Sequence, residues 1–356
     1  MKISLIIPYY NTPVELVDRL FKSVNEQSNF DFEELEILLI DDCSTEKYNF
    51  DRLAQFDNLA DDKIRIINLK ENVGPGVARQ YGIRYAKGDF LLFADADDRF
   101  MLTHKETVKT ENGEEEKEYG VFEFFLKLID VHKDANIIRT SWLEEQHNTE
   151  TNKIVFIPHL AQLDNTWMHG KLFKRSFING NSIHFHPFLR KQEDTYFNSL
   201  ATEMAKKTAV AYNGLLSYVW SDDNKNSLTR NDNFLYSYNA MCEFVDAIDY
   251  VVGYLNGLER EDISIVEKVI GNLVYIYWML QTPSWRDKSK KEYYDALIKR
   301  TAQFEQKYRD VWNYISLDSA QFAEMYISRY SIQYETEKFI PQETFKQFLK
   351  NIRKKL

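Results

Sequence analysis

Apolar and polar residues follow one another along the first hundred positions in the order expected of strands separated by helices. Four apolar runs, each closed by polar or turn residues, read as strands at 3–7, 36–40, 64–69 and 90–93. Between the first two runs, Leu16, Leu20 and Val24 recur at steps of four, which predicts a helix. Continuous apolar strands alternating with helices predict a mostly parallel sheet that is covered on both faces.

Local signals predict where these helices begin. The range 12–15 reads Thr-Pro-Val-Glu, so Thr12 is expected as the N-cap residue and Pro13 at the first helical position. A second helix is expected after the Gly-Pro-Gly at 74–76, with Val77, Tyr81 and Tyr85 on one stripe.

The middle of the chain changes character twice. Residues 102–119 form a charged stretch that predicts a solvated hairpin or loop turning at 112–113. From about Phe234 onward, apolar residues recur at three- and four-residue steps, which predicts an all-helical second domain. We therefore expect an α/β domain over 1–232 and a helical domain over 233–356 for acceptor selection, oligomerisation or membrane association. Later helical windows lie near 262–281, 289–308, 318–330 and 342–355.

Composition narrows the class of protein. The chain has 356 residues and a formal net charge of -10, so an unpatterned surface would repel a nucleic-acid backbone. Two cysteines cannot build a disulfide framework. No signal peptide is evident at the N-terminus, and the most apolar later window, 263–280, carries charges that disfavour a membrane span. A cytoplasmic protein is expected, with the inner face of the membrane as the alternative location.

Acidic residues follow two of the predicted strands. Asp41 and Asp42 end one of them, and such a pair alone is more often a turn or a helix cap. Asp95, Asp97 and Asp98 follow the run at 90–93. Because three carboxylates within four residues repel one another unless a cation is present, this second group predicts a site for a divalent cation with a diphosphate.

Four strings in this part of the chain resemble, in order and in spacing, the family 2 glycosyltransferases of GT-A fold. They are LIIPYYN at 5–11, LIDDCST at 39–45, NVG at 72–74 followed by AR at 78–79, and FADADD at 93–98. Three later strings fit the same family: HGKLFKR at 169–175, QED at 192–194 and SLTR at 227–230. Cys43 and Gln80 depart from the family pattern, in which Gly and Asn are usual.

The resemblance implies a donor site at the carboxyl ends of the strands. Pro8, Tyr10 and Asp42 would line the nucleotide pocket, with Asp42 accepting a hydrogen bond from the base. Arg79 would hold the nucleotide or its diphosphate, and Asp95 would lie toward the ribose and the sugar.

The same resemblance implies the cation ligands and the diphosphate contacts. Asp97 would be the main ligand of Mn²⁺ or Mg²⁺, with Asp98 as the alternative. Ser227 and Arg230 would contact the donor from a polar loop.

The resemblance also implies a catalytic pair and an acceptor side. Asp194 would be the general base, beside Glu193, and His169 and Lys171 would lie on the acceptor or diphosphate side. A carboxylate that primes an acceptor hydroxyl opposite the leaving group gives one displacement with inversion. The range 306–310 lacks the Trp of the processive synthases, so one sugar is expected per encounter.

The predicted function is therefore transfer of one sugar from a nucleotide-sugar, most simply a UDP-sugar, to a hydroxyl of a cell-envelope or polysaccharide glycan. Two alternatives stay open: an inactive sugar-binding protein of the same fold, and a glycosyltransferase that acts on hydroxylated nucleic-acid bases. A peripheral membrane contact through the basic amphipathic range 342–356, and a homo-oligomer through the helical domain, are further expectations.

Overall fold

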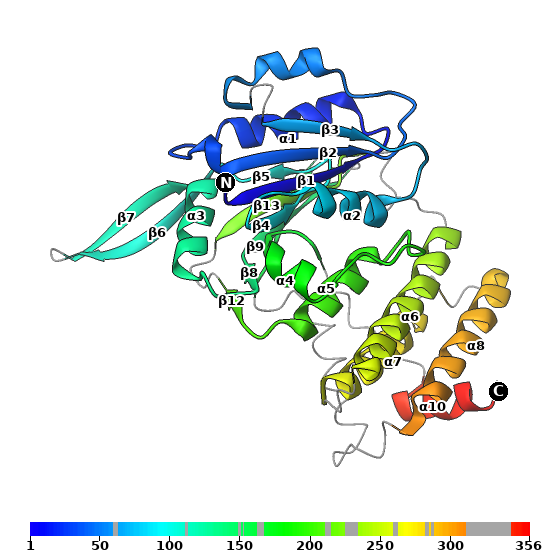
Figure 1. Ribbon diagram of the computed structural model, residues 1–356. Helices are drawn as coiled ribbons and strands as arrows, with labels where there is room; N and C mark the ends of the chain where they lie inside the picture. Colours follow the sequence, from blue (N-terminus) through cyan, green and yellow to red (C-terminus); the bar gives the residue numbers. More distant parts are fainter. Residues whose placement is uncertain are drawn as a thin grey trace. The chain divides into compact units, whose positions relative to one another are not determined.

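The computed structural model divides the chain into two compact units, Met1–Asn231 and Asp232–Leu356 (Figure 1). The first unit contains three sheets and several helices, and the elements of the second unit that the structure describes are all helical. The structure describes residues 1–59, 63–110, 113–148, 151, 153–161, 167–210, 215–224, 234–258, 263–281, 285, 288–310 and 343–356.

The core of the first unit is a seven-stranded sheet. All of its neighbouring strands run parallel except around β11, which is antiparallel to both of its neighbours, β4 and β8. This sheet confirms the mostly parallel α/β architecture that the sequence predicted. The order is β12 (Thr208–Val210), β8 (Ile137–Arg139), β11 (Lys171–Lys174), β4 (Phe90–Phe93), β1 (Ile3–Tyr9), β2 (Leu35–Asp41) and β3 (Ile64–Asn68).

Helices cover this sheet because successive side chains of its strands point to opposite faces. Leu5, Ile7 and Leu39 share one core cluster with residues of α1 (Val14–Asn25), and α2 (Pro75–Tyr85) packs on β1 and β2. A glycine is required at Gly82 of α2, since an added Cβ would lie 2.3 Å from the Cγ2 of Ile6.

One local prediction about these helices was wrong. Thr12 does not cap α1: Pro13 is the N-cap residue, its extended ψ of 131° excludes it from the helix, and no side chain caps the end. The stripe that ends in Tyr85 is not the buried face of α2, because Tyr85 is 42% exposed. The small residues Gly76, Ala78 and Gly82 are buried instead, since they allow the helix to approach the sheet closely.

A four-stranded sheet lies next to the acidic residues that follow β4. Its order is β10 (Lys153–His159), β9 (Ser141–Asn148), β13 (Leu216–Ser221) and β5 (Arg99–Phe100). β5 begins directly after Asp98 and pairs antiparallel with β13, so the end of β13 lies beside the loop 95–98.

The charged stretch forms the predicted hairpin. β6 (Thr103–Thr110) pairs antiparallel with β7 (Gly113–Gly120), and the hairpin projects from the unit (Figure 1). The helix that follows the hairpin is α3 (Val121–Val131). Two further helices, α4 (Arg175–Gly180) and α5 (Glu193–Met204), complete the first unit together with short 3-10 turns.

The second unit contains α6 (Phe234–Gly257), α7 (Ile263–Leu280), α8 (Lys291–Lys307) and α10 (Phe345–Arg353). α10 turns its apolar side inward, where the Phe348 ring lies 5.4 Å from the ring of Tyr277. The predicted helix near 318–330 lies outside the described residues. Within the described part of the chain, no helix combines the length and the apolar character that crossing a bilayer requires.

Candidate active site

Asp42 follows β2 and organises the loop before α2. Its carboxylate accepts hydrogen bonds from the backbone N–H groups of Val73 (2.7 Å) and Gly74 (2.8 Å) and from the Asn72 amide (3.0 Å). Gly74 has a φ of 90°, a conformation that glycine adopts at little cost. Burial raises the pKa of Asp42, and the two backbone hydrogen bonds oppose that shift. Asp42 therefore holds the 72–74 loop at the carboxyl edge of the sheet.

The other two residues predicted for the nucleotide pocket lie at the neighbouring strand end. Pro8 is half-buried near the end of β1, and Tyr10, directly after the strand, is 50% exposed. The Asp42 N–H donates to the carbonyl of Tyr9 at 2.8 Å, which joins the two strand ends. Pro8, Tyr10 and Asp42 thus share one edge of the sheet.

Arg79 joins two motifs that are far apart in the sequence. Its side chain extends from α2, is 6% exposed, and donates to Asp95 (2.5 Å) and to Glu193 (2.9 Å). Burial alone would raise the pKa of Asp95, but Arg79 and His169 together hold it below its usual value. Arg79 therefore brings the acidic loop 95–98 and the N-terminus of α5 into one site.

The two carboxylates of α5 have different surroundings. Burial, with Asp194 as a second cause, raises the pKa of Glu193 to about 7 in spite of Arg79. Burial also raises the pKa of Asp194, whose side chain is only partly buried and accepts from the Thr195 N–H. Because Glu193 is committed to Arg79, Asp194 is the more accessible of the two bases.

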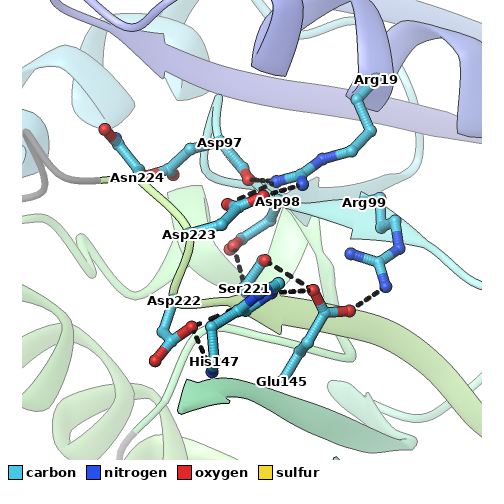
Figure 2. Close-up of polar contacts among 10 residues, drawn as sticks. All are labelled: Arg19, Asp97, Asp98, Arg99, Glu145, His147, Ser221, Asp222, Asp223 and Asn224. Atoms are coloured by element: carbon cyan, nitrogen blue, oxygen red, sulfur yellow. Dashed lines mark hydrogen bonds and ion pairs between the residues drawn. The ribbon is translucent and has the colours of Figure 1, made fainter. Parts of the chain in front are cut away.

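Asp97 and Asp98 are held by the end of β13 (Figure 2). The Asp97 carboxylate accepts from the Asn224 amide at 2.6 Å. Asp98 is 1% exposed and accepts from the Tyr218 hydroxyl (2.6 Å) and the Ser221 N–H (2.9 Å). Burial, followed by the charges of Asp97 and Asp95, raises the pKa of Asp98 well above its usual value.

His169 and Lys171 lie on the side of this loop formed by β11 and the residues before it. The His169 ring stacks on Tyr218, with the ring centroids 4.8 Å apart, and on Trp167. Lys171 is 3% exposed, donates to the Trp167 carbonyl, and lowers the pKa of Asp194 by its charge. Both predicted residues therefore lie near the acidic loop and the α5 carboxylates.

The donor set fits a divalent cation. One ligand atom each from Asp95, Asp98 and His169 lies within 4.8 Å of the others. Oxygen-rich sets of this kind suit hard cations, and burial beside Asp97 and Asp95 raises the pKa of Asp98. A bound divalent cation would relieve the repulsion among these carboxylates. Asp97, which the resemblance implied as the main ligand, is not a member of this group.

A second cluster with similar composition is organised differently. Glu145, His147 and Asp223 also bring ligand atoms within 4.8 Å of one another. Here, however, Arg99 pairs with Glu145 and Arg19 pairs with Asp223, so arginines of the chain already supply positive charge (Figure 2). This arrangement is that of an ion-pair network rather than a cation site.

A cavity of about 200 Å³ lies near the nucleotide residues but is not formed by them. It is lined by Tyr9 and Asp41, the last residues of β1 and β2, which directly precede Tyr10 and Asp42. The remaining lining residues are Leu39, Lys47, Tyr48, Ile66 and Asn68.

Several residues that shape the site were not predicted from the sequence. Asn72, which contacts Asp42, lies within one of the strings that resemble the family, so the sequence could have indicated it. Arg19, Tyr218 and Asn224 lie in no such string, and nothing in the sequence indicated their contacts. Ser227 and Arg230, predicted as donor contacts, lie outside the described residues.

Comparison with known proteins agrees with this geometry. Residues 4–159 match the model of the family described as Glycosyl transferase family 2. A poly(ribitol-phosphate) beta-glucosyltransferase of Bacillus spizizenii is 28% identical over 253 residues, which are 70% of this chain and 37% of that protein. The poly(ribitol-phosphate) beta-N-acetylglucosaminyltransferase TarS of Staphylococcus aureus is 26% identical over 215 residues, 59% of this chain and 34% of TarS. The chain thus spans about a third of the length of these relatives.

Solved structures show the same fold. A crystal structure of S. aureus TarS 1-349 in complex with UDP-GlcNAc superposes with a TM-score of 0.66, at 16% identity, over 99% of this chain and 92% of the other. These comparisons confirm the family resemblance and the GT-A fold class that the sequence predicted. The role of each site residue stays a prediction.

Proposed function

We propose that this chain, whose residues 4–159 match the model of Glycosyl transferase family 2, transfers one sugar from a UDP-sugar to a hydroxyl of an anionic cell-envelope polymer of the poly(ribitol phosphate) class. The donor assignment is supported by the TarS structure in complex with UDP-GlcNAc. The acceptor assignment is supported by the names of the two relatives, which act on poly(ribitol phosphate).

The observation that carries the proposal is the double contact of Arg79. One guanidinium binds Asp95 of the acidic loop and Glu193 beside the expected base. A transferase needs its donor site and its base next to each other, because the acceptor oxygen must reach the anomeric carbon of the bound sugar. By binding both Asp95 and Glu193, Arg79 holds the expected donor site and the expected base next to each other.

In the proposed reaction, Asp194 removes the proton of the acceptor hydroxyl as the oxygen attacks the anomeric carbon. The bond from that carbon to the diphosphate breaks, and UDP leaves with the bonding electron pair. Attack from the face opposite the diphosphate inverts the anomeric centre. A positioned base of this kind contributes about 10² to 10⁴ in rate.

The leaving diphosphate gains negative charge as the bond breaks. Asp97 would hold Mn²⁺ or Mg²⁺ beside its sequence neighbour Asp98, whose ligand atom lies within 4.8 Å of those of Asp95 and His169. A bound divalent cation would supply electrostatic stabilisation of that charge. Asp42, Pro8 and Tyr10 would receive the nucleotide at the adjacent sheet edge.

A donor screen tests the function. Release of nucleoside diphosphate is measured with UDP-, GDP- and TDP-sugars, with Mn²⁺, in the presence and absence of poly(ribitol phosphate). We expect release with a UDP-sugar that depends on the polymer. Release with a GDP- or TDP-sugar and not with a UDP-sugar would overturn the donor assignment. Release at the same rate with and without the polymer would overturn the acceptor assignment.

The base is tested by Asp194→Asn. We expect donor binding to stay nearly unchanged and transfer to fall by at least about a hundredfold. Asp134→Asn is the matched control, because Asp134 is an exposed aspartate that forms a surface ion pair with Lys207. Turnover of Asp194→Asn near the wild-type rate would reject the assignment.

A further inference from the structure

Arg19 reaches the acidic loop from helix α1. Its guanidinium donates to the backbone carbonyl of Asp97 and to both carboxylate oxygens of Asp223 (Figure 2). The Arg19 side chain is 26% exposed, so much of this contact is shielded from water. One arginine thus connects the predicted main cation ligand with the segment that follows β13.

The same segment holds Asp97 at a second point. Asn224, the residue after Asp223, donates its amide N–H to the Asp97 carboxylate at 2.6 Å. Asp97 is therefore fixed at its carbonyl by Arg19 and at its carboxylate by Asn224. Because Asn224 is neutral, this hydrogen bond orients the carboxylate and adds no positive charge.

The segment 221–224 is itself firmly attached. The Ser221 N–H donates to Asp98 at 2.9 Å and its hydroxyl to Glu145 at 3.1 Å. The Asp222 carboxylate accepts from the backbone N–H of His147 at 2.7 Å. Arg19 consequently ties the acidic loop to a segment that is itself hydrogen-bonded to β9 and to Asp98.

We propose that Arg19 is a positioning residue of the cation site, which sets the direction of the Asp97 carboxylate by holding the Asp97 carbonyl against Asp223. This inference rests on the proposed function, since it assumes that Asp97 binds the cation. A guanidinium suits the task because its planar fork donates to two acceptors at once, whereas a lysine ammonium has no fixed fork.

Coulomb's law and positioning predict opposite outcomes when Arg19 is replaced. Removing a positive charge close to a cation site would by itself tighten cation binding. If Arg19 positions Asp97, its removal weakens cation binding instead. Arg19→Met separates the two effects by sign, and Arg19→Lys, which keeps the charge, isolates the geometry.

The experiment measures free Mn²⁺ by electron paramagnetic resonance as the ion is titrated into the full chain with saturating UDP. We expect Arg19→Met and Arg19→Lys each to raise the Kd for Mn²⁺ at least about fivefold, with metal-free UDP binding unchanged. Arg52→Met is the matched control, because Arg52 pairs with Asp18, the residue that precedes Arg19 in α1. We expect the control to bind Mn²⁺ like the wild type.

The outcomes distinguish the two claims. Failure of the wild type to bind Mn²⁺ with UDP would overturn the proposed cation site. Normal wild-type binding with unchanged or tighter binding by both Arg19 variants would overturn the positioning role alone. On an Asp97→Asn background, Arg19→Lys should add no further loss, since Arg19 acts through Asp97. An additional loss of equal size there would also contradict the inference.

Discussion

Each unit of the protein buries a carboxylate, and the two are stabilised in different ways. Glu305 in α8 of the helical unit has a fully buried side chain and pairs with Arg309 (2.9 Å) and Arg353 (2.7 Å). Asp98 in the α/β unit is buried to the same degree but accepts hydrogen bonds from neutral groups, a tyrosine hydroxyl and a backbone N–H.

The pKa shifts of these two residues have opposite directions. Burial alone would raise the pKa of Glu305, but its two arginines hold the pKa below its usual value. Burial and the neighbouring aspartates raise the pKa of Asp98. A buried carboxylate that is neutralised by arginines of the fold is a structural element, whereas a buried carboxylate such as Asp98, whose partners are neutral and whose pKa is raised, marks a place where a cation from outside would bind.

The largest effect is expected when the acidic loop is neutralised. Asp97→Asn should lower the rate of sugar transfer by about 10²- to 10³-fold, because it removes a ligand of the cation that would stabilise the leaving diphosphate. Metal-free thermal stability should not fall, since the substitution removes a charge that repels Asp98. The measurements are kcat/KM at saturating Mn²⁺ and melting without metal. Activity close to that of Asp134→Asn would contradict the cation site.

Neutralising the buried carboxylate of the helical unit should have the reverse outcome. Glu305→Gln leaves two arginines without their acceptor, so we expect a loss of about 2–4 kcal/mol in the free energy of unfolding and an unchanged kcat. Because the pKa of Glu305 is lowered in the folded state, its contribution is present above its ordinary pKa near 4.5 and is lost as pH falls through the lowered value. Denaturant unfolding at pH 7 and at acidic pH checks both statements, and equal stability of the variant and wild type at pH 7 would refute them.

The sequence predicted those parts of the site that depend on local pattern. Apolar runs define where strands end, and parallel strands end on one edge, so Asp42 and Asp95 were expected on the same side of the sheet. Asp194 was expected near them only through the family resemblance. These expectations needed no knowledge of long-range contacts.

The rest depends on contacts that leave no local pattern. Arg19 and the Asp97 carbonyl are 78 residues apart, and Asn224 and the Asp97 carboxylate are 127 apart. Arg19 lies at a polar position of an amphipathic helix, where an arginine is ordinarily solvated, so the sequence gives no reason to single it out. The wrong cap at Thr12 had a different cause, because Pro13 has the extended backbone of a residue that precedes a helix.

On acidification, activity is expected to fall at a higher pH than stability does. The pKa of Glu193 is raised to about 7, so this carboxylate becomes protonated in mildly acidic solution, and the pKa of its neighbour Asp194 is raised as well. We expect kcat/KM to rise with pH up to about 7 and then to level, while the contribution of Glu305 to stability persists to lower pH.

Glu193→Gln sharpens this prediction. The substitution removes one negative neighbour and leaves the charge of Arg79 to Asp194, so the acidic limb of the profile should move down by about one pH unit. Glu203→Gln, at the other end of α5, is the control and should leave the limb in place. A limb that stays at the same pH in Glu193→Gln would show that the pair does not control the reaction.

The smallest effect concerns charges that are fully solvated. Lys346, Lys350 and Lys354 recur every four residues on the exposed side of α10, whereas its apolar side is packed within the helical unit. Only electrostatic attraction is therefore left for the predicted membrane contact, at about 1 kcal/mol per lysine on an anionic surface at low salt.

Deleting residues 342–356 would be a poor test of that contact, because it removes core residues such as Phe348 and Ile352. Replacing the three lysines with glutamine leaves the core intact. We expect this variant to sediment less with vesicles of anionic lipid at low salt and to keep the wild-type kcat. Added salt should abolish the sedimentation of the wild type too, since exposed charges are screened within about 10 Å at 0.1 M. Vesicle binding that persists in salt would mean that α10 inserts its apolar side, which requires that side to leave the packing it has in the helical unit.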